Sequence, residues 1–477
     1  MPRRSEPGAS AATSAMQLTG AIVVRLRKPA RMRNIELGLI AFAFVLVTGA
    51  FVLVEFGALG HLSSHWAVYL SALAVLVLVL HVVLRVTAPE ADPFLVPIAV
   101  LLNGVGLAEI HRIDIAKDWS GWEALAIRQV VWTAIALVLA IAALILVRNH
   151  RVLQRYRYLA MLTGIVLLIL PMIPGLGKTV NGAQIWVGLG IASFQPGEFA
   201  KVALAVFFAG YLVTARDSLS MAGKRFLGLR LPRARDFGPL IVVFAASMLV
   251  LVVQRDLGTA LLYFGLFLVM LYVATGRGSW IVIGLLLFAA GAWVASRFLD
   301  YVDRRLVGWL DAFNPAYVGD QSYQLVQGLF GMAAGGIFGT GLGQGRPSIT
   351  PLSQSDFIIS ALGEELGLVG LFAILVLYLL FVGRGFRIAF AGVDDFSRLL
   401  AAGLGFAIAL QVFIVVGGVT RVIPLTGLTT PFLAAGGSSL VANWIIVVLL
   451  LRLSDGVRSG PRVIIESEDR PRSAVHA

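Results

Sequence analysis

The sequence predicts an all-α fold, a polytopic integral membrane protein of about 12 transmembrane helices. Of its 477 residues, 58% are hydrophobic and only 13% are charged, which is about half the charged share of a soluble domain. The mean hydropathy is +0.89, and the apolar residues form long blocks of the roughly 20 residues that a helix needs to cross a bilayer. The chain has no cysteine, so a disulfide scaffold is excluded.

Twelve apolar segments are candidates for these helices. They cover residues 35–57, 66–86, 92–109, 129–147, 158–174, 198–214, 237–253, 257–275, 279–297, 358–383, 398–419 and 432–452. The third is the weakest, because it contains Pro97 and Asn103, and the fifth is short for a span. Only residues 254–256 separate the seventh segment from the eighth, so we expect a tight hairpin there. The first segment is too long for a signal-peptide core, so we expect it to stay in the mature protein.

Lys and Arg predict the orientation of the chain, because they gather on the cytoplasmic side of membrane proteins. With both termini in the cytoplasm, 27 of the 38 Lys and Arg residues fall in cytoplasmic segments. Residues 1–34 are then a basic cytoplasmic tail, 457–477 a second cytoplasmic tail, and 298–357 a large extracellular loop. This bias explains the net charge of +12 without a nucleic-acid partner, since basic segments beside spans bind anionic membrane lipids.

Common signatures of soluble enzymes fail on inspection. Residues 177–179 resemble the end of a phosphate-binding P-loop, but Met172 stands where that motif needs a glycine. Six histidines with no cysteine give no zinc-ligand spacing. The loop 298–357 has no histidine for a Ser-His-Asp triad. Any chemistry must therefore use ionisable residues at the ends of spans, which are functional candidates by default.

The first group of such residues is at the start of the sixth segment. Pro196 suits the first turn of a helix, and Glu198 then meets the positive end of the helix dipole. Lys201 follows three residues later on the same helix face, where the two side chains can pair. The alternative is a capped helix with a snorkelling lysine.

The second group, Gln254 and Asp256, forms the polar turn between the seventh and eighth segments. A tight turn favours Asp and Gly for structural reasons alone. A purely structural role is therefore the alternative to a functional one.

The third group begins with Asp356, where the long loop enters the tenth segment. An Asp at this place commonly caps the helix by accepting from free backbone N–H groups. Glu364 and Glu365 are about two turns further inside an apolar helix, which makes them harder to explain as caps. We expect Asp356 to act alone at the membrane surface, with the deeper acids organising the helix bundle.

The fourth group is Arg421, Thr426, Ser438 and Ser439, interspersed with prolines and paired glycines. Broken backbone of this kind is tolerated at membrane depth only where it lines a cavity, although small residues also serve close helix packing. All four groups lie on, or open towards, the same outer face.

Taken together, these stretches resemble the SEDS family, the polytopic cell-wall polymerases typified by RodA and FtsW. The family's motifs occur in the same order, from about residue 97 to 452. They are Arg128-Gln129, Asn181-Gly182-Ala183 with Trp186, Phe194-Gln195-Pro196 with Glu198 and Lys201, Gln254 with Asp256-Leu257-Gly258-Thr259, Tyr323-Gln324, Gly341-Leu342-Gly343, Asp356-Phe357-Ile358 with Glu364-Glu365-Leu366-Gly367, and Pro424, Thr426-Gly427, Pro431-Phe432 and Gly436-Gly437-Ser438-Ser439. One departure is Arg255, where the family usually has proline.

The resemblance implies a ten-span core over residues 87–456. Residues 35–86 are then two additional N-terminal spans, to which the resemblance assigns no purpose. An even number of added spans preserves the orientation of the core, in agreement with the charge bias.

The resemblance also implies a function: a peptidoglycan glycosyltransferase that polymerises lipid II at the outer face of the cytoplasmic membrane, for cell-wall elongation and cell shape. Asp356 matches the family's essential aspartate, and we assign it as the general base. Lys201, Arg346 and Arg421 are the candidate cations for the lipid pyrophosphate, and a divalent cation, Mg²⁺ or Mn²⁺, is a candidate cofactor. The implied partner is a class B penicillin-binding protein, a transpeptidase.

Two readings from other classes stay open. A lipid II flippase would also need intramembrane acids, broken helices and a polar cavity, but it has no chemical need for Asp356 at the outer surface. A scaffold that recruits wall enzymes would leave these acids incidental. Within the family, an FtsW-like division polymerase is the alternative, and the short C-terminal tail favours the RodA-like elongation branch.

Overall fold

Ten helices in the described part of the chain are long and apolar enough to cross a membrane. The computed structural model describes residues 29–63, 65–180, 182–189, 192–220, 225–226, 229–230, 241, 244–245, 247–250 and 252–459. The ten helices are α2 (Pro29–Leu59), α3 (His65–Thr87), α4 (Leu95–Ala116), α5 (Leu125–Leu146), α8 (Pro196–Ser220), α10 (Leu257–Thr275), α11 (Ser279–Phe298), α15 (Ile358–Ala391), α16 (Asp395–Val419) and α17 (Gly437–Arg458). The predicted fold class, a polytopic all-α membrane protein, is confirmed.

The predicted count of about 12 spans is approximate. The fifth predicted segment, 158–174, is the short helix α7 (Arg157–Ile169) followed by the single turn η2 (Leu170–Met172). Much of the seventh, 237–253, lies outside the described residues, as do most of the predicted tails 1–34 and 457–477. The third is longer than predicted and continues to Ala116, because its polar side chains are buried against other helices.

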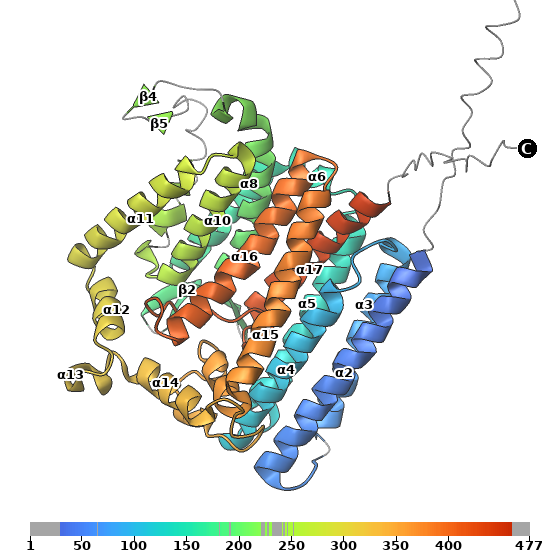
Figure 1. The fold of residues 1–477 in the computed structure, drawn as a ribbon, viewed down its shortest axis with the longest axis vertical. Helices are drawn as coiled ribbons and strands as arrows, with labels where there is room; N and C mark the ends of the chain where they lie inside the picture. Colours follow the sequence, from blue (N-terminus) through green and yellow to red (C-terminus); the bar gives the residue numbers. More distant parts are fainter. Residues whose placement is uncertain are drawn as a thin grey trace, which may run out of the picture.

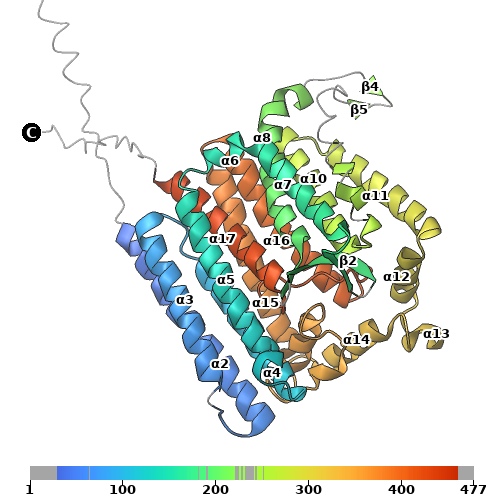
Figure 2. The same cartoon turned by 180° about the vertical axis from the view of Figure 1, so that it is seen from behind.

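The helices pack as a bundle with the α2–α3 pair at one flank, beside α4 and α5 (Figures 1 and 2). Neighbouring pairs are α15 with α16, α5 with α17, and α7 with α8. Helix α17 is mostly buried within the bundle, whereas α11 is mostly exposed at the opposite flank from α2. An apolar helix that is exposed in the protein is covered by lipid in a membrane.

Short elements gather at the two ends of the bundle. One end carries α12 (Asp300–Leu310), α13 (Pro315–Val318), α14 (Tyr323–Gly335), η3 (Pro347–Ile349) and η1 (Gly121–Glu123), together with an antiparallel sheet of order β1-β2-β3. The strands are β1 (Gly177–Val180), β2 (Ala183–Leu189) and β3 (Ala192–Phe194). The other end carries α6 (Arg151–Arg155), β4 (Arg225–Phe226) and β5 (Leu229–Arg230) (Figure 1). We name the end with residues 300–357 the outer end.

Helix α15 is broken at Gly367, where φ is 67° and ψ is −170°. The break frees backbone groups that the neighbouring loop satisfies: Thr340 N donates to the carbonyl of Glu364 at 3.0 Å, and Gly341 N donates to that of Glu365 at 3.0 Å. Irregular backbone at membrane depth needs such partners. The glycine-rich loop 336–346 is therefore joined to the first turns of α15.

Candidate active site

A polar cavity of about 260 Å³ opens at the outer end. Five separate stretches of chain meet there, because the sheet, α12 and the two irregular loops fold over the ends of α8, α10 and α17. The lining residues are Val180, Ala183, Ile185, Trp186, Gln195, Arg255, Asp256, Arg305, Leu352, Ser355, Asp356, Thr426, Gly427, Thr429, Ala435, Gly436, Ser438 and Ser439.

Asp356 lies in the wall of this cavity and is partly buried. Helix α15 begins after Phe357, so Phe357 and not Asp356 occupies the N-cap position. Gly427, whose φ of 78° favours glycine, lies beside the carboxylate: a Cβ there would be in ordinary contact with Asp356 Oδ2, at 3.6 Å. Burial raises the pKa of Asp356 to about 7, although the charge of Arg305 and a hydrogen bond from Ser355 lower it. A carboxyl with a pKa near neutrality is suited to accept a proton at physiological pH.

Arg305 is the cation that the fold brings to this acid. It extends from α12, and its Nη1 donates to the carbonyl oxygen of Thr426 at 3.2 Å. Its charge acts on both Asp256 and Asp356. Arg305 is not among the cations that the sequence suggests for the site, which are Lys201, Arg346 and Arg421. On α12, Arg305 lies between the buried residues Val302 and Gly308, each three positions away, which turns its side chain towards the protein.

Asp256 and Gln254 have different roles in their turn. Asp256 lines the cavity and caps α10, where its Oδ1 accepts from Thr259 N at 3.0 Å. Burial raises the pKa of Asp256. Gln254 donates instead to the carbonyl oxygen of Leu168, and its own carbonyl accepts from Gln184 N at 3.2 Å. Gln254 therefore attaches the β1–β2 hairpin and α7 to the cavity wall.

Arg255, between these two residues, is a second cation of the cavity. Its backbone has a φ of 62°. Its guanidinium lies 5.8 Å from the ring centre of Tyr301. Arg255 thus adds a positive charge to the wall of the cavity.

Glu198 and Lys201 lie one layer below the cavity. As predicted, they pair: Lys201 Nζ donates to Glu198 Oε2 at 2.8 Å. The same ammonium donates to Gln411 Oε1 at 2.8 Å and to Asn443 Oδ1 at 3.4 Å, which joins α8 to α16 and α17. Both charges are nearly inaccessible, and a buried pair is tolerated only when its remaining hydrogen bonds are satisfied in this way. Gln411 and Asn443 are polar residues inside apolar segments, a signal that the sequence interpretation passed over.

Thr426, Ser438 and Ser439 line the cavity. Ser438 Oγ accepts from the backbone N–H of Gln195 at 2.8 Å. Ser439 Oγ accepts from Asn443 Nδ2 at 3.2 Å. The cavity floor is therefore connected to the buried Lys201 network by direct hydrogen bonds.

Arg346, Glu364 and Arg421 are not among the described residues that line the cavity. Glu364 Oε1 accepts from the backbone N–H of Arg346 at 2.6 Å, while the Arg346 side chain is exposed. Arg421 donates to the carbonyl oxygens of Trp309 at 2.8 Å and Leu310 at 2.7 Å. Both contacts hold loops in place, and the one from Arg421 fixes the end of the helix that carries Arg305.

The cavity offers two carboxylates, Asp256 and Asp356, to a metal ion. Within the described residues no group of three or more His, Cys, Asp or Glu side chains could hold an ion. Mg²⁺ is commonly bound by one or two carboxylates together with substrate phosphates. The donor set therefore fits an ion that arrives with a phosphorylated substrate.

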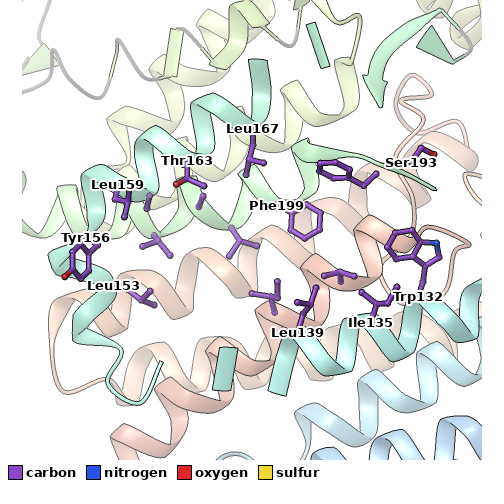
Figure 3. A pocket seen from close by; sticks show the side chains of 17 residues that line it. Trp132, Ile135, Leu139, Leu153, Tyr156, Leu159, Thr163, Leu167, Ser193 and Phe199 are labelled. Carbon is purple, nitrogen blue, oxygen red and sulfur yellow. The ribbon is translucent and has the colours of Figure 1, made fainter. Parts of the chain in front are cut away.

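A second, apolar groove of about 740 Å³ is lined by residues of α5, α7, α8 and α17. In Figure 3, Ser193 and Trp132 lie at one end and Tyr156 at the other. Ser193 and Phe194 line the groove and Gln195 lines the polar cavity, so the two adjoin. On α17, Val441 of the groove is three residues from Ser438 of the cavity and on the same face.

Comparison with known proteins identifies the family of this chain. The model of the FtsW, RodA and SpoVE family, described as "Cell cycle protein", matches residues 93–459. The chain belongs to the FtsW/RodA/SpoVE family. The match begins after α3, so the α2–α3 pair lies outside it.

Relatives in this family share much of the chain. It is 46% identical over 434 residues to the peptidoglycan glycosyltransferase RodA of Mycobacterium tuberculosis (strain ATCC 25618 / H37Rv), covering 89% of this chain and 91% of that protein. It is 44% identical over 452 residues to RodA of Mycobacterium leprae, with 93% and 94% covered. The residues from 93 onward make up less than 89% of this chain, so both alignments also include residues before the family core. Stage V sporulation protein E of Bacillus subtilis is 33% identical over 372 residues, covering 76% of this chain and 96% of that protein.

Solved structures of the family share the fold. A chain from a peptidoglycan synthase complex that coordinates polymerization and crosslinking superposes with a TM-score of 0.63 at 26% identity, covering 78% of this chain and 99% of that chain. The rod shape determining protein RodA of Thermus thermophilus gives a TM-score of 0.56 at 24% identity, with 78% and 98% covered.

Proposed function

We propose that this family member is a peptidoglycan glycosyltransferase that polymerises lipid II at the outer face of the cytoplasmic membrane. The observation that carries the proposal is the cavity at the outer end, in which a carboxyl with a pKa of about 7 shares the wall with the half-buried Arg305 and lies next to an apolar groove. The name of the mycobacterial relatives, at 44% and 46% identity, supports the same reaction.

Asp356 is the general base in this proposal. The 4-hydroxyl oxygen of the acceptor sugar attacks the anomeric carbon of the donor, its proton passes to Asp356, and the bond to the lipid pyrophosphate breaks. A positioned base typically contributes 10² to 10⁴ in rate. The pKa of about 7 leaves Asp356 substantially ionised at neutral pH while keeping it basic enough to take the proton.

Arg305 and Arg255 are the cations that we assign to the pyrophosphate, since both line the cavity. Preformed positive charge at the leaving group stabilises the charge that develops there. Lys201 and Arg421, two of the candidates from sequence, use their charged groups in contacts elsewhere in the protein. The third, Arg346, has an exposed side chain that does not line the cavity, and its backbone N–H is held by Glu364. Their role in the proposal is to hold the residues that form the cavity.

The apolar groove supports a lipid-linked substrate. A donor whose sugar and pyrophosphate occupy the polar cavity needs an apolar surface for its lipid tail. The groove provides one, because its lining residue Phe194 directly precedes Gln195, which lines the cavity. A divalent cation, Mg²⁺ or Mn²⁺, bound by Asp256 and the pyrophosphate would neutralise the leaving group.

The partner and the orientation are also part of the proposal. We propose a class B penicillin-binding protein as the partner, which the likeness to a chain of a peptidoglycan synthase complex supports. The excess of Lys and Arg in the segments at the end opposite the cavity supports cytoplasmic termini and an extracellular cavity. The FtsW of Geobacter sp. (strain M18) is 35% identical, so the RodA relatives favour an elongation role over division.

The decisive experiment is polymerisation of lipid II by the purified protein with its partner in detergent. In detergent there are no longer two compartments separated by a membrane, so lipid II cannot be flipped from one to the other. Glycan strands formed under these conditions therefore require a polymerase. Strands of many disaccharides from the wild-type protein are the expected result. Transport of lipid II across vesicles without any strand formation would instead favour the flippase.

A further inference from the structure

The outer end of α2 is in direct backbone contact with the glycine-rich turn 341–343. A Cβ on Gly57 would lie 2.3 Å from the carbonyl oxygen of Leu342, and a Cβ on Gly343 would lie 2.6 Å from that of Val54. Small residues let backbones approach this closely within a membrane. A larger side chain at Gly57 would force the helix and the turn apart.

The same turn is held from the opposite side by Glu365 on α15. Glu365 accepts from Gly343 N at 2.8 Å and from Gly345 N at 3.2 Å. Arg112 on α4 donates to Glu365 Oε1 at 3.0 Å and to the carbonyl oxygen of Gly345 at 2.7 Å. The turn is thus clamped between α2 on one side and α4 with α15 on the other.

A buried polar contact fixes α2 at this height. Glu55 Oε1 lies 2.7 Å from His111 Nε2, and His111 is the neighbour of Arg112 on α4. Glu55 is inaccessible and also accepts from Ser63 N at 2.7 Å. An ionisable residue buried in a membrane helix is costly and marks a functional contact by default. The register of α2 against α4 is therefore set beside the turn.

The clamped turn leads directly to the segment that carries Asp356. Beyond Gly345, Arg346 N is held by Glu364, and η3 follows at once. Gln354 is then fixed from two sides, by Lys117 Nζ at 3.3 Å to its side chain and by Ala435 N at 2.8 Å to its carbonyl. A displacement of the turn 341–343 would therefore move residues 345–354, which are held at both ends, and with them Asp356.

We propose that α2 is a positioning element of the active site, which sets the place of Asp356 by holding the turn 341–343 through Gly57. The inference rests on the proposed glycosyltransferase function. It gives a role to a helix that precedes the family match at residue 93. The added helix pair then acts on the chemistry and not only on anchoring in the membrane.

The test compares Gly57→Ala and Gly57→Val with Gly49→Ala and Gly49→Val on the same helix. Gly49 is the matched control, because no described atom lies within 4 Å of a Cβ placed there. Full-length variants with the partner are assayed for the kcat and KM of lipid II polymerisation at matched thermal stability. We expect kcat to fall about tenfold or more for Gly57→Val, with an intermediate fall for Gly57→Ala, since small misplacements of a reacting group are expensive. KM and both Gly49 variants should change by less than about threefold, because binding groups lie elsewhere.

A second measurement does not depend on activity. A cysteine at Ser355, in the otherwise cysteine-free chain, should react with a soluble thiol reagent several-fold faster when Gly57 is replaced than when Gly49 is. Faster labelling would uphold the positioning role even if the wild-type protein failed to polymerise, which would count against the proposed function alone. Equal labelling and equal kcat in the Gly57 and Gly49 variants would overturn the inference, and so would a loss of kcat that only follows the loss of folded protein.

Discussion

Lys201 donates a hydrogen bond to Glu198 at 2.8 Å in the layer directly beneath the cavity that holds Asp356. The two charges are buried between α8, α16 and α17, and Asn443 links them to Ser439 in the cavity floor. Their arrangement supports the floor from below, and a substrate in the cavity would meet Ser439 before it met Lys201.

We expect Lys201→Met to destabilise the protein by about 3 to 5 kcal/mol, because it leaves the Glu198 charge buried without its partner. The measurement is the Tm in detergent. The double variant Lys201→Met with Glu198→Leu should recover most of the stability, since replacing a buried pair by apolar residues is often neutral. A double variant with restored Tm but no polymerisation would show that Lys201 has a chemical role as well.

Asp356→Asn should lower polymerisation by about two orders of magnitude or more, because an amide cannot accept the proton. Lipid II binding should survive, since the cations that we assign to the pyrophosphate are on other segments. Asp356→Glu should give partial or no rescue, because it moves the carboxylate. The readout is glycan strand length with variants that are fully folded at the assay temperature, and near-normal strands from Asp356→Asn would remove the base assignment.

The rate should fall about tenfold per pH unit below a pKa of about 7, as Asp356 becomes protonated. Stability should respond in the opposite direction. Folding raises this pKa from 3.8 to about 7. The contribution of Asp356 to the free energy of unfolding is therefore fully present below pH 3.8 and is lost as the pH rises through 7. Asp356→Asn should therefore have a higher Tm than wild type at pH 8, with a smaller difference at pH 5. A Tm difference independent of pH would contradict the raised pKa.

Arg305→Ala should reduce polymerisation at least tenfold, because it removes positive charge from the cavity. Its neighbour Arg304 is exposed on the same helix and provides the matched control. The charge of Arg305 lowers the pKa of Asp356, so Arg305→Ala should also shift the pH–rate profile to higher pH. A loss of rate with an unmoved profile would place Arg305 away from Asp356 during catalysis.

Single cysteines in the cysteine-free chain test the orientation. Ala316→Cys, on α13 at the outer end, should react with a membrane-impermeant reagent in intact cells. Val152→Cys, 49% exposed on α6 at the other end, should react only after the membrane is permeabilised. The reverse pattern would place the cavity in the cytoplasm.

Local sequence determined the membrane fold, because about 20 apolar residues in a row have one stable solution in a bilayer. It also determined the pairing of Glu198 with Lys201, since a spacing of three on a helix brings two side chains together whatever the rest of the chain does. The sequence does not predict the break at Gly367, which lies against the distant backbone of Gly339: a Cβ on Gly367 would lie 2.2 Å from Gly339 N.

Only the tertiary structure decided which charges reach the cavity. The sequence favoured Lys201, Arg346 and Arg421 as the candidate cations, whereas the cations that line the cavity are Arg255 and Arg305. Their assignment depends on how α12 packs against the loop that contains Thr426, a contact between stretches 121 residues apart. No local pattern encodes a contact at that separation, because it depends on the packing of every helix between the two stretches.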